Sequence, residues 1–186
     1  MSDLATLAAT TAEELRRGVA DVSEQDFAAL AQAIAKANRV VLYGCGREGL
    51  MMRALAMRLH HLGRGVHMQG DMSCPPVGPG DLFFVASGPG RLATASALIG
   101  QARAGGAQIA CITAEPFGPD PQACDVVLTI PVQTMARDQN GATSILPMGS
   151  VFEGAMFLLF ELLVLDLQSR LAETGPSMRA RHANLE

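Results

Sequence analysis

The ten residues from Val40 to Gly49, V-V-L-Y-G-C-G-R-E-G, constrain the fold more than any other stretch of the chain. Four apolar residues with strong strand preference end at a glycine turn, and a helix-forming sequence follows. This pattern predicts a strand buried on both faces, a tight turn and a helix. Gly44 and Gly46 allow the turn, and Gly49 lets the helix lie close to the strand. Because the N–H groups at a helix N-terminus carry partial positive charge, the turn is a candidate site for a phosphate or carboxylate. Its spacing also fits G-x-G-x-x-G, so nucleotide binding and an ordinary strand-to-helix turn both remain open.

The rest of the chain alternates strands with helices. Two helices are expected before the first strand, with Ser23 capping the second, and a long helix is expected from Ser150 to about Leu171. The segments 116–121 and 131–149 are expected to be a turn and an irregular loop. The alternation predicts an α/β fold with a parallel sheet. The expected helices lie at about 3–22, 24–37, 46–62 and 91–104, and the later strands at 66–68, 82–86, 108–113 and 126–130.

A second glycine turn follows the third predicted strand. In an open parallel sheet of strand order 2-1-3-4-5, ligands bind beyond the carboxyl ends of strands one and three. Both glycine loops would then face one site. The candidate ligand-binding residues are Gly44, Gly46, Arg47 and Glu48 in the first loop, and Ser87, Gly88, Pro89, Gly90 and Arg91 in the second.

Composition narrows the class of protein. The 186 residues are 49% hydrophobic and 17% charged, with a formal net charge of −4. One domain is expected, with an N-terminal helical arm at about 3–37 and a C-terminal tail at about 173–186. The sequence has no basic run and few aromatic residues, which argues against nucleic-acid binding. The four cysteines form no C-x-x-C pair, and the N-terminus lacks a signal-peptide pattern, so reduced thiols and a cytoplasmic location are expected.

The long helix from Ser150 is apolar nearly all round, so it must be buried on several sides. Glu161 and Asp166 interrupt the apolar run before it reaches the roughly 20 residues of a membrane span. We therefore expect a subunit interface rather than a membrane segment. The histidines at 60, 61 and 67 match no metal-ligand pattern, so no metal site is expected.

Four motifs together resemble a known family. They are G-C-G-R-E-G and S-G-P-G after the first and third strands, L-P-M-G-S-V-F-E at 146–153, and R-H-A-N-L-E at 181–186. With them the chain resembles the sugar isomerase (SIS) domain proteins, and among these the 6-phospho-3-hexuloisomerases. The resemblance spans nearly the whole chain. It implies a five-stranded parallel sheet between helices in three layers, a homotetramer or homodimer, no metal or organic cofactor, and interconversion of 3-hexulose 6-phosphate with fructose 6-phosphate.

That reaction moves a proton between adjacent carbons of a hydroxyketone through an enediolate, so it needs a carboxylate or imidazole base. By motif, Glu153 and His182 are the catalytic candidates. Alternatives remain for both: Ser150 and Glu153 also form S-x-x-E, a capping box that fixes a helix start. His182 is also interpretable as a solvated histidine in a polar tail. Arg47 either holds a phosphate or sugar oxygen or forms a surface ion pair.

The chain also departs from the family pattern. Glu48 stands where the family has serine, and S-G-P-G-R-L at 87–92 replaces S-G-S-G-E-T, so Ser87 is the only phosphate-binding hydroxyl kept. We hypothesise that Glu48 pairs with Arg91 across the site, which would cancel its repulsion of a phosphate. Two functions therefore stay open. One is an isomerase of a phosphorylated ketose, and the other is a non-catalytic SIS module that binds a sugar derivative and regulates a partner.

Overall fold

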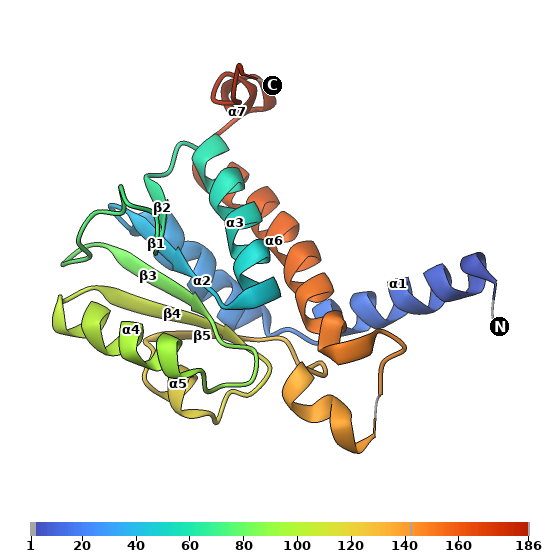
Figure 1. Ribbon diagram of the computed structural model, residues 1–186. Coiled ribbons are helices and arrows are strands. Elements are labelled where there is room, and N and C mark those ends of the chain that lie inside the picture. Colours follow the sequence, from blue (N-terminus) through green and yellow to red (C-terminus); the bar gives the residue numbers. More distant parts are fainter. Residues whose placement is uncertain (1–2, 142, 186) are drawn as a thin grey trace.

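The protein contains one five-stranded parallel sheet, seen in a computed structural model that describes residues 3–141 and 143–185 (Figure 1). The strand order is β2-β1-β3-β4-β5, which confirms the order expected from the sequence. The central strand pairing places Val40 opposite both Val66 and Leu82. The strands are β1 (Val40–Tyr43), β2 (Val66–Met68), β3 (Leu82–Ala86), β4 (Gln108–Thr113) and β5 (Val126–Thr129).

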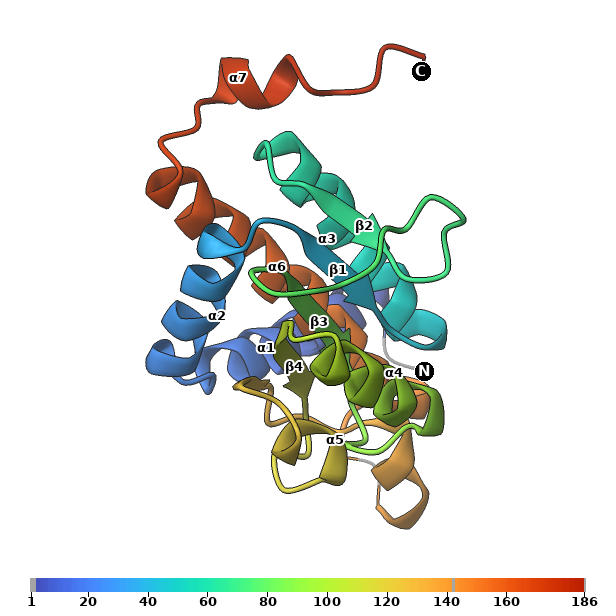
Figure 2. The same cartoon turned by 90° about the vertical axis from the view of Figure 1, so that its left-hand side faces the viewer.

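Helices cover both faces of the sheet, giving the three layers expected of the fold (Figures 1 and 2). Leu42 and Phe84 point to one face and pack with α2, α3 and α6, whereas Val41 and Phe83 point to the other and pack with α4. This alternation is the period-two geometry of a strand buried on both sides. The helices are α1 (Leu4–Ala20), α2 (Glu24–Lys36), α3 (Gly46–His61), α4 (Ala93–Ala104), α5 (Pro119–Gln122), α6 (Ser150–Arg170) and α7 (Gly175–Arg179).

Local sequence signals explain several element boundaries. The Ser23 hydroxyl accepts a hydrogen bond from the Asp26 N–H at 3.2 Å, as expected of an N-cap. A Cβ atom at position 49 would lie 2.5 Å from the carbonyl oxygen of Gly44. Glycine is therefore required at 49 for α3 to start against the turn that ends β1.

Three segments differ from the expected pattern. The predicted turn at 116–121 contains the one-turn helix α5, and the predicted irregular loop at 131–149 contains two 3₁₀ helices, η1 (Met135–Asn140) and η2 (Pro147–Gly149). Prolines near the starts of α5 and η2 supply a helical φ, although they also mark turns, so sequence alone does not separate the two outcomes. Helix α4 begins at Ala93 rather than Arg91. Ala142 of the loop and Glu186 of the terminal motif lie outside the described residues.

Helix α6 is a core helix with one uncovered side. Residues 147–170 are long and apolar enough to cross a membrane by length and composition, but half of the most apolar stretch is buried within the protein. The buried side packs in the core with residues of α2 and α3. The other side exposes Phe157, Leu158, Leu162 and Leu165.

Candidate active site

A cavity of about 410 Å³ lies beyond the carboxyl ends of β1 and β3. Both glycine loops contribute to it, which confirms that they face one site. Two other segments complete the wall: the stretch that leads into η1, and the stretch from η2 to the first turn of α6. The lining residues are Cys45, Gly46, Arg47, Glu48, Pro89, Leu92, Thr134, Met135, Ala136, Met148 and Glu153.

Arg47 joins the first glycine loop to the start of α6. Its Nε donates to Glu153 Oε1 at 3.3 Å, one terminal nitrogen donates to the Ser150 hydroxyl at 3.3 Å, and the other donates to the Met148 carbonyl oxygen at 2.6 Å. The planar guanidinium thus uses its fork geometry to hold three groups at once. Arg47 therefore fixes the position of Glu153 relative to the cavity.

Glu153 does not act as a helix cap. The N-cap of α6 is Gly149, none of the described side chains caps this helix, and the Ser150 hydroxyl donates to the Pro147 carbonyl oxygen instead. Glu153 Oε2 is buried and has no hydrogen-bond partner among the described residues. Buried polar atoms are almost always paired, so an unpaired carboxylate oxygen in a cavity wall marks a place for a ligand or water.

Thr134 supplies a second unpaired polar atom in the same wall. Thr134 is only 4% exposed, and its buried Oγ1 has no hydrogen-bond partner among the described residues. A hydroxyl both donates and accepts, so it suits a sugar oxygen in either protonation state. Glu153 and Thr134 together give the cavity one free acceptor and one free hydroxyl.

The L-P-M-G-S motif builds this wall through unusual backbone geometry. Met148 and Gly149 both have left-handed backbone conformations, with φ of 57° and 68°. A Cβ atom at position 149 would lie 2.2 Å from the Met135 backbone nitrogen. Glycine therefore lets η2 pack on the segment that carries Thr134. A left-handed methionine costs on the order of 1–3 kcal/mol, and here it aims its carbonyl at Arg47.

Glu48 connects the two glycine loops. Its side chain is buried, and both carboxylate oxygens accept from the Gly88 N–H, at 3.2 and 3.1 Å. Burial raises the pKa of Glu48 to about 7, against the opposing effect of the Gly88 N–H; the Glu153 charge raises it further and Arg47 lowers it. The hypothesis that Glu48 pairs with Arg91 is wrong for the described residues. Glu48 accepts the Gly88 N–H instead, and the Arg91 side chain is exposed.

The second glycine loop binds a carboxylate that sequence analysis does not identify. Asp120, at the second position of α5, is 1% exposed. Its Oδ2 accepts from the Ser87 hydroxyl at 2.6 Å and from the Leu92 N–H at 2.8 Å, and its Oδ1 accepts from the Ser96 hydroxyl. Ser87, expected to contact a substrate, is thus engaged inside the protein.

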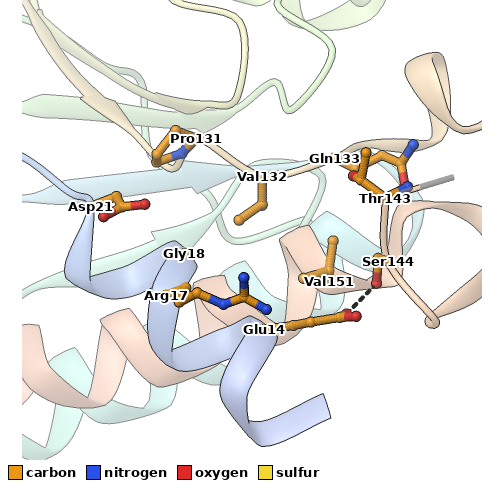
Figure 3. A pocket seen from close by; sticks show the side chains of 10 residues that line it. All are labelled: Glu14, Arg17, Gly18, Asp21, Pro131, Val132, Gln133, Thr143, Ser144 and Val151. Atoms are coloured by element: carbon orange, nitrogen blue, oxygen red, sulfur yellow. Dashed lines mark hydrogen bonds between the residues drawn. The ribbon is translucent and has the colours of Figure 1, made fainter. Parts of the chain in front are cut away.

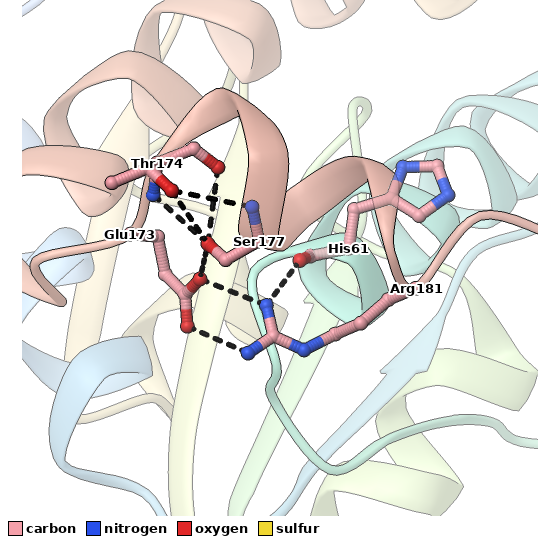
Figure 4. Close-up of polar contacts among 5 residues, drawn as sticks. All are labelled: His61, Glu173, Thr174, Ser177 and Arg181. Carbon is pink, nitrogen blue, oxygen red and sulfur yellow. Dashed lines mark hydrogen bonds and ion pairs between the residues drawn. The ribbon is translucent and has the colours of Figure 1, made fainter.

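His182 lies at the opposite end of α3 from the cavity. Its ring stacks on that of His61, with centroids 5.3 Å apart. Arg181 holds the tail there, because it donates to the His61 carbonyl oxygen at 2.9 Å and forms two bonds to Glu173 (Figure 4). His61 lies thirteen positions after Glu48 on α3, an axial distance of about 20 Å. Glu153 and His182 of one subunit are therefore not brought together.

Another hollow, of about 270 Å³, lies between α1 and the segments around Val132 and Ser144 (Figure 3). Glu14 reaches across it to accept a hydrogen bond from the Ser144 hydroxyl. None of the described residues that the sequence marks as candidates lines it. This hollow is therefore not a candidate for the predicted chemistry.

The family model of the SIS domain matches residues 33–158, which include both loops and the first turn of α6. The chain belongs to the SIS domain family. A 3-hexulose-6-phosphate isomerase of Mycobacterium gastri is 35% identical over 174 residues, which cover 94% of this chain and 87% of that relative. Another, of Bacillus subtilis strain 168, is 30% identical and covers 93% and 94% of the two chains. A Methanococcus jannaschii protein, whose crystal structure led to an inferred 3-hexulose-6-phosphate isomerase function, has a TM-score of 0.81 at 25% identity over 98% of each chain.

The SIS motifs identify Arg47 and Glu153, whereas Glu48 stands out by its departure from them. The structure brings these three residues into one cavity. Thr134 and Asp120 carry no such signal, because a lone threonine and an aspartate between two prolines are ordinary residues in loops and short turns. Their importance becomes visible only through burial and hydrogen bonding. Met148 lies in the L-P-M-G-S-V-F-E motif, but the motif does not predict its left-handed backbone conformation.

Proposed function

We propose that this protein is a sugar-phosphate isomerase that interconverts 3-hexulose 6-phosphate and fructose 6-phosphate. Two curated relatives at 30% identity or more, matched over most of their length, bear the name of that activity. The observation that best supports the proposal is the hydrogen bonding of the two Glu153 carboxylate oxygens. One of its oxygens is fixed by Arg47, and the other is buried in the cavity wall with no hydrogen-bond partner in the described part of the chain.

In the proposed mechanism, Glu153 Oε2 takes the proton from the carbon beside the substrate carbonyl. The electron pair of that C–H bond forms the C=C bond of an enediolate, and the carbonyl oxygen takes up negative charge. The Thr134 hydroxyl donates a hydrogen bond to this oxygen. Glu48 protonates this oxygen and then accepts the proton of the hydroxyl on the neighbouring carbon. Glu153 returns its proton to the former carbonyl carbon, so that the carbonyl has moved by one position.

Glu48 is suited to serve as the proton donor in this site. Its pKa of about 7 keeps a sizeable fraction of the carboxyl protonated near neutral pH, whereas an exposed glutamate would be ionised. Two carboxyl groups held in different protonation states are a common arrangement for acid–base catalysis. Glu48 would supply the proton and Glu153 the base.

Exchange of substrate hydrogen with solvent tests the activity directly. The full-length protein is incubated with fructose 6-phosphate in D₂O, and deuterium incorporation and the formation of a 3-ketose are followed by NMR. We expect both. Binding of fructose 6-phosphate by calorimetry without deuterium incorporation would instead favour the non-catalytic SIS module that regulates a partner. The bond from the Ser87 hydroxyl to Asp120 favours this second candidate, because it engages the one phosphate-binding hydroxyl that is kept from the family pattern.

We further propose a homotetramer or homodimer, located in the cytoplasm, in which His182 serves the site of a neighbouring subunit. The exposed apolar side of α6 offers an interface. The distance between His182 and the cavity of its own subunit supports the exchange, and four free cysteines fit a reducing compartment. Light scattering after size exclusion should give a mass above that of one chain, and a strictly monomeric protein would contradict the assembly.

Mixing two inactive variants tests the placement of His182. Glu153→Gln and His182→Ala, each of low activity alone, should regain part of the wild-type activity when unfolded and refolded together. In a shared site, one mixed interface carries both mutations and the other carries neither. Absence of recovery in mixtures that light scattering shows to be assembled would place both residues in the site of one subunit.

A further inference from the structure

One carboxylate joins helix α1 to the segment that builds part of the cavity wall. Glu14 Oε1 accepts a hydrogen bond from the Ile145 N–H at 3.1 Å, and Glu14 Oε2 accepts one from the Ser144 hydroxyl (Figure 3). In the part of the chain that the structure describes, no other residue of α1 makes a hydrogen bond to the chain beyond position 22. These two bonds therefore connect regions that are 130 and 131 positions apart.

The residues that Glu14 holds lead directly into the L-P-M-G-S motif. The Ser144 hydroxyl also accepts the Leu146 N–H at 3.0 Å, which fixes the next turn of the chain. Pro147 then has a φ angle that its ring restricts. Little conformational freedom therefore remains between the bonds to Glu14 and the backbone of Met148.

Met148 is the residue through which this segment reaches the proposed base. Its backbone is left-handed, a conformation that a residue other than glycine keeps only where its surroundings enforce it. Its carbonyl oxygen accepts from Arg47 at 2.6 Å, and Arg47 in turn holds Glu153 Oε1. Glu14 supplies part of the constraint on Met148, so a continuous set of contacts runs from α1 to Glu153.

Helix α1 also packs closely on two other parts of the wall. A Cβ atom at position 18 would lie 2.4 Å from Val132 Cγ1, and one at position 154 would lie 2.8 Å from Leu15 Cδ2. Val132 lies two positions before Thr134, and Gly154 follows the proposed base directly. Helix α1 therefore supports both of the segments that complete the cavity outside the glycine loops.

We propose that Glu14 is a positioning residue of this isomerase, whose carboxylate holds residues 144–148 so that Met148 keeps Arg47 and Glu153 in the orientation for proton abstraction. The inference rests on the proposed isomerase function and assigns a role in it to a helix that does not line the cavity. Because Glu14 does not contact the substrate, its removal should affect turnover more than substrate binding.

Three variants test this role. Glu14→Ala removes both acceptors, whereas Glu14→Gln keeps an oxygen that can accept the Ile145 N–H and an amide that can donate to the Ser144 hydroxyl. Glu13→Ala is the matched control, because Glu13 is the neighbouring carboxylate of the same helix and pairs with exposed arginines within α1. Deuterium exchange from D₂O into fructose 6-phosphate gives kcat and KM for each protein. Rates are taken at a temperature at which thermal melts show every variant fully folded.

In Glu14→Ala we expect kcat to fall about tenfold or more while KM changes less than about threefold, because a misplaced base slows proton abstraction without removing a substrate contact. Glu14→Gln should recover most of the lost kcat, and Glu13→Ala should match the wild type. A wild-type kcat in Glu14→Ala, or an equal fall in Glu14→Gln, would overturn the proposal and leave the isomerase function standing.

Amide hydrogen exchange, measured by mass spectrometry on the peptide that spans 143–149, keeps the test independent of catalysis. The Ile145 N–H should exchange about tenfold or more faster in Glu14→Ala and at the wild-type rate in Glu13→Ala. If the wild type moves no deuterium into fructose 6-phosphate, the proposed function fails, and unchanged amide exchange in Glu14→Ala would separately show that Glu14 does not hold the wall. If Glu14→Ala does not fold, Ser144→Ala removes the other partner of the bond, and an unchanged kcat there contradicts the proposal.

Discussion

The two glycine loops of this protein begin from similar sequence patterns and end in different chemical states. The first loop turns Arg47 and Glu48 toward the cavity, and Arg47 holds a carboxylate whose second oxygen is free. In the second loop, Glu48 accepts the Gly88 N–H, and Asp120 accepts the Ser87 hydroxyl and the Leu92 N–H, so these donors are already bonded within the protein. A glycine turn before a helix therefore offers a ligand only those donors that no carboxylate of the same chain has taken.

The largest effect on activity is expected from replacing Glu153, the proposed base that the first loop holds. Glu153→Gln keeps the shape of the side chain and an acceptor for Arg47, but it cannot take a proton. Loss of a general base lowers rates by about 10²–10⁴-fold, so deuterium exchange into fructose 6-phosphate should fall by that factor. Thermal stability should change little, because Glu153 does not cap α6. Wild-type activity in this variant would remove the first loop from the proposed chemistry.

A smaller fall in activity is expected from replacing Arg47, the residue that holds the proposed base in place. Arg47→Lys keeps the positive charge but loses the fork that reaches Glu153, Ser150 and Met148 together. Misplacement of a catalytic group by about 1 Å can cost on the order of 10²-fold, and we expect a fall in kcat of up to this size. Arg53→Lys is a suitable control, because Arg53 makes an exposed ion pair with Asp71. Equal kcat values in the two variants would show that charge alone suffices at position 47.

The smallest expected effect concerns Glu48, the residue that joins the two loops. Its folded-state pKa of about 7 exceeds the ordinary value of 4.5, so the folded protein binds more protons than the unfolded chain between these two values. The contribution of Glu48 to wild-type stability should therefore fall as pH rises through this window and level off above it. Glu48→Gln cannot titrate, so its stability relative to wild type should rise across the same window, by on the order of 1–3 kcal/mol.

Urea unfolding of both proteins at several pH values from below 4.5 to above 7 measures this difference. Glu24→Gln is the control, because Glu24 lies exposed in the first turn of α2. A stability difference between Glu48→Gln and wild type that does not depend on pH would show that folding leaves the pKa of Glu48 at its ordinary value of 4.5, so that the carboxyl is ionised near neutral pH. The carboxyl would then be a fixed acceptor for Gly88 rather than a proton donor.

Much of the fold and part of the site could be predicted from the sequence. Apolar runs with glycine boundaries gave the five strands, and Ser23 gave a helix start, because these signals depend on residues close together in the chain. Both loops were expected to face one site, and they do. The sequence could not show whether Glu153 caps a helix or lines a cavity, because the S-x-x-E pattern of Ser150 and Glu153 is compatible with both roles.

The sequence by itself determined which residues form strands and helices, and its motifs indicated the SIS family and placed Arg47 and Glu153 among the candidates. The tertiary structure decided which polar atoms are free. Glu48 reaches Gly88 and Asp120 reaches Ser87 across 40 and 33 positions of the chain. Such pairs depend on how strands and helices pack, because a buried carboxylate binds whichever donors the fold brings within about 3 Å of it. Local sequence patterns do not contain those distances, so they could not show which donors of the second loop are already bonded within the protein.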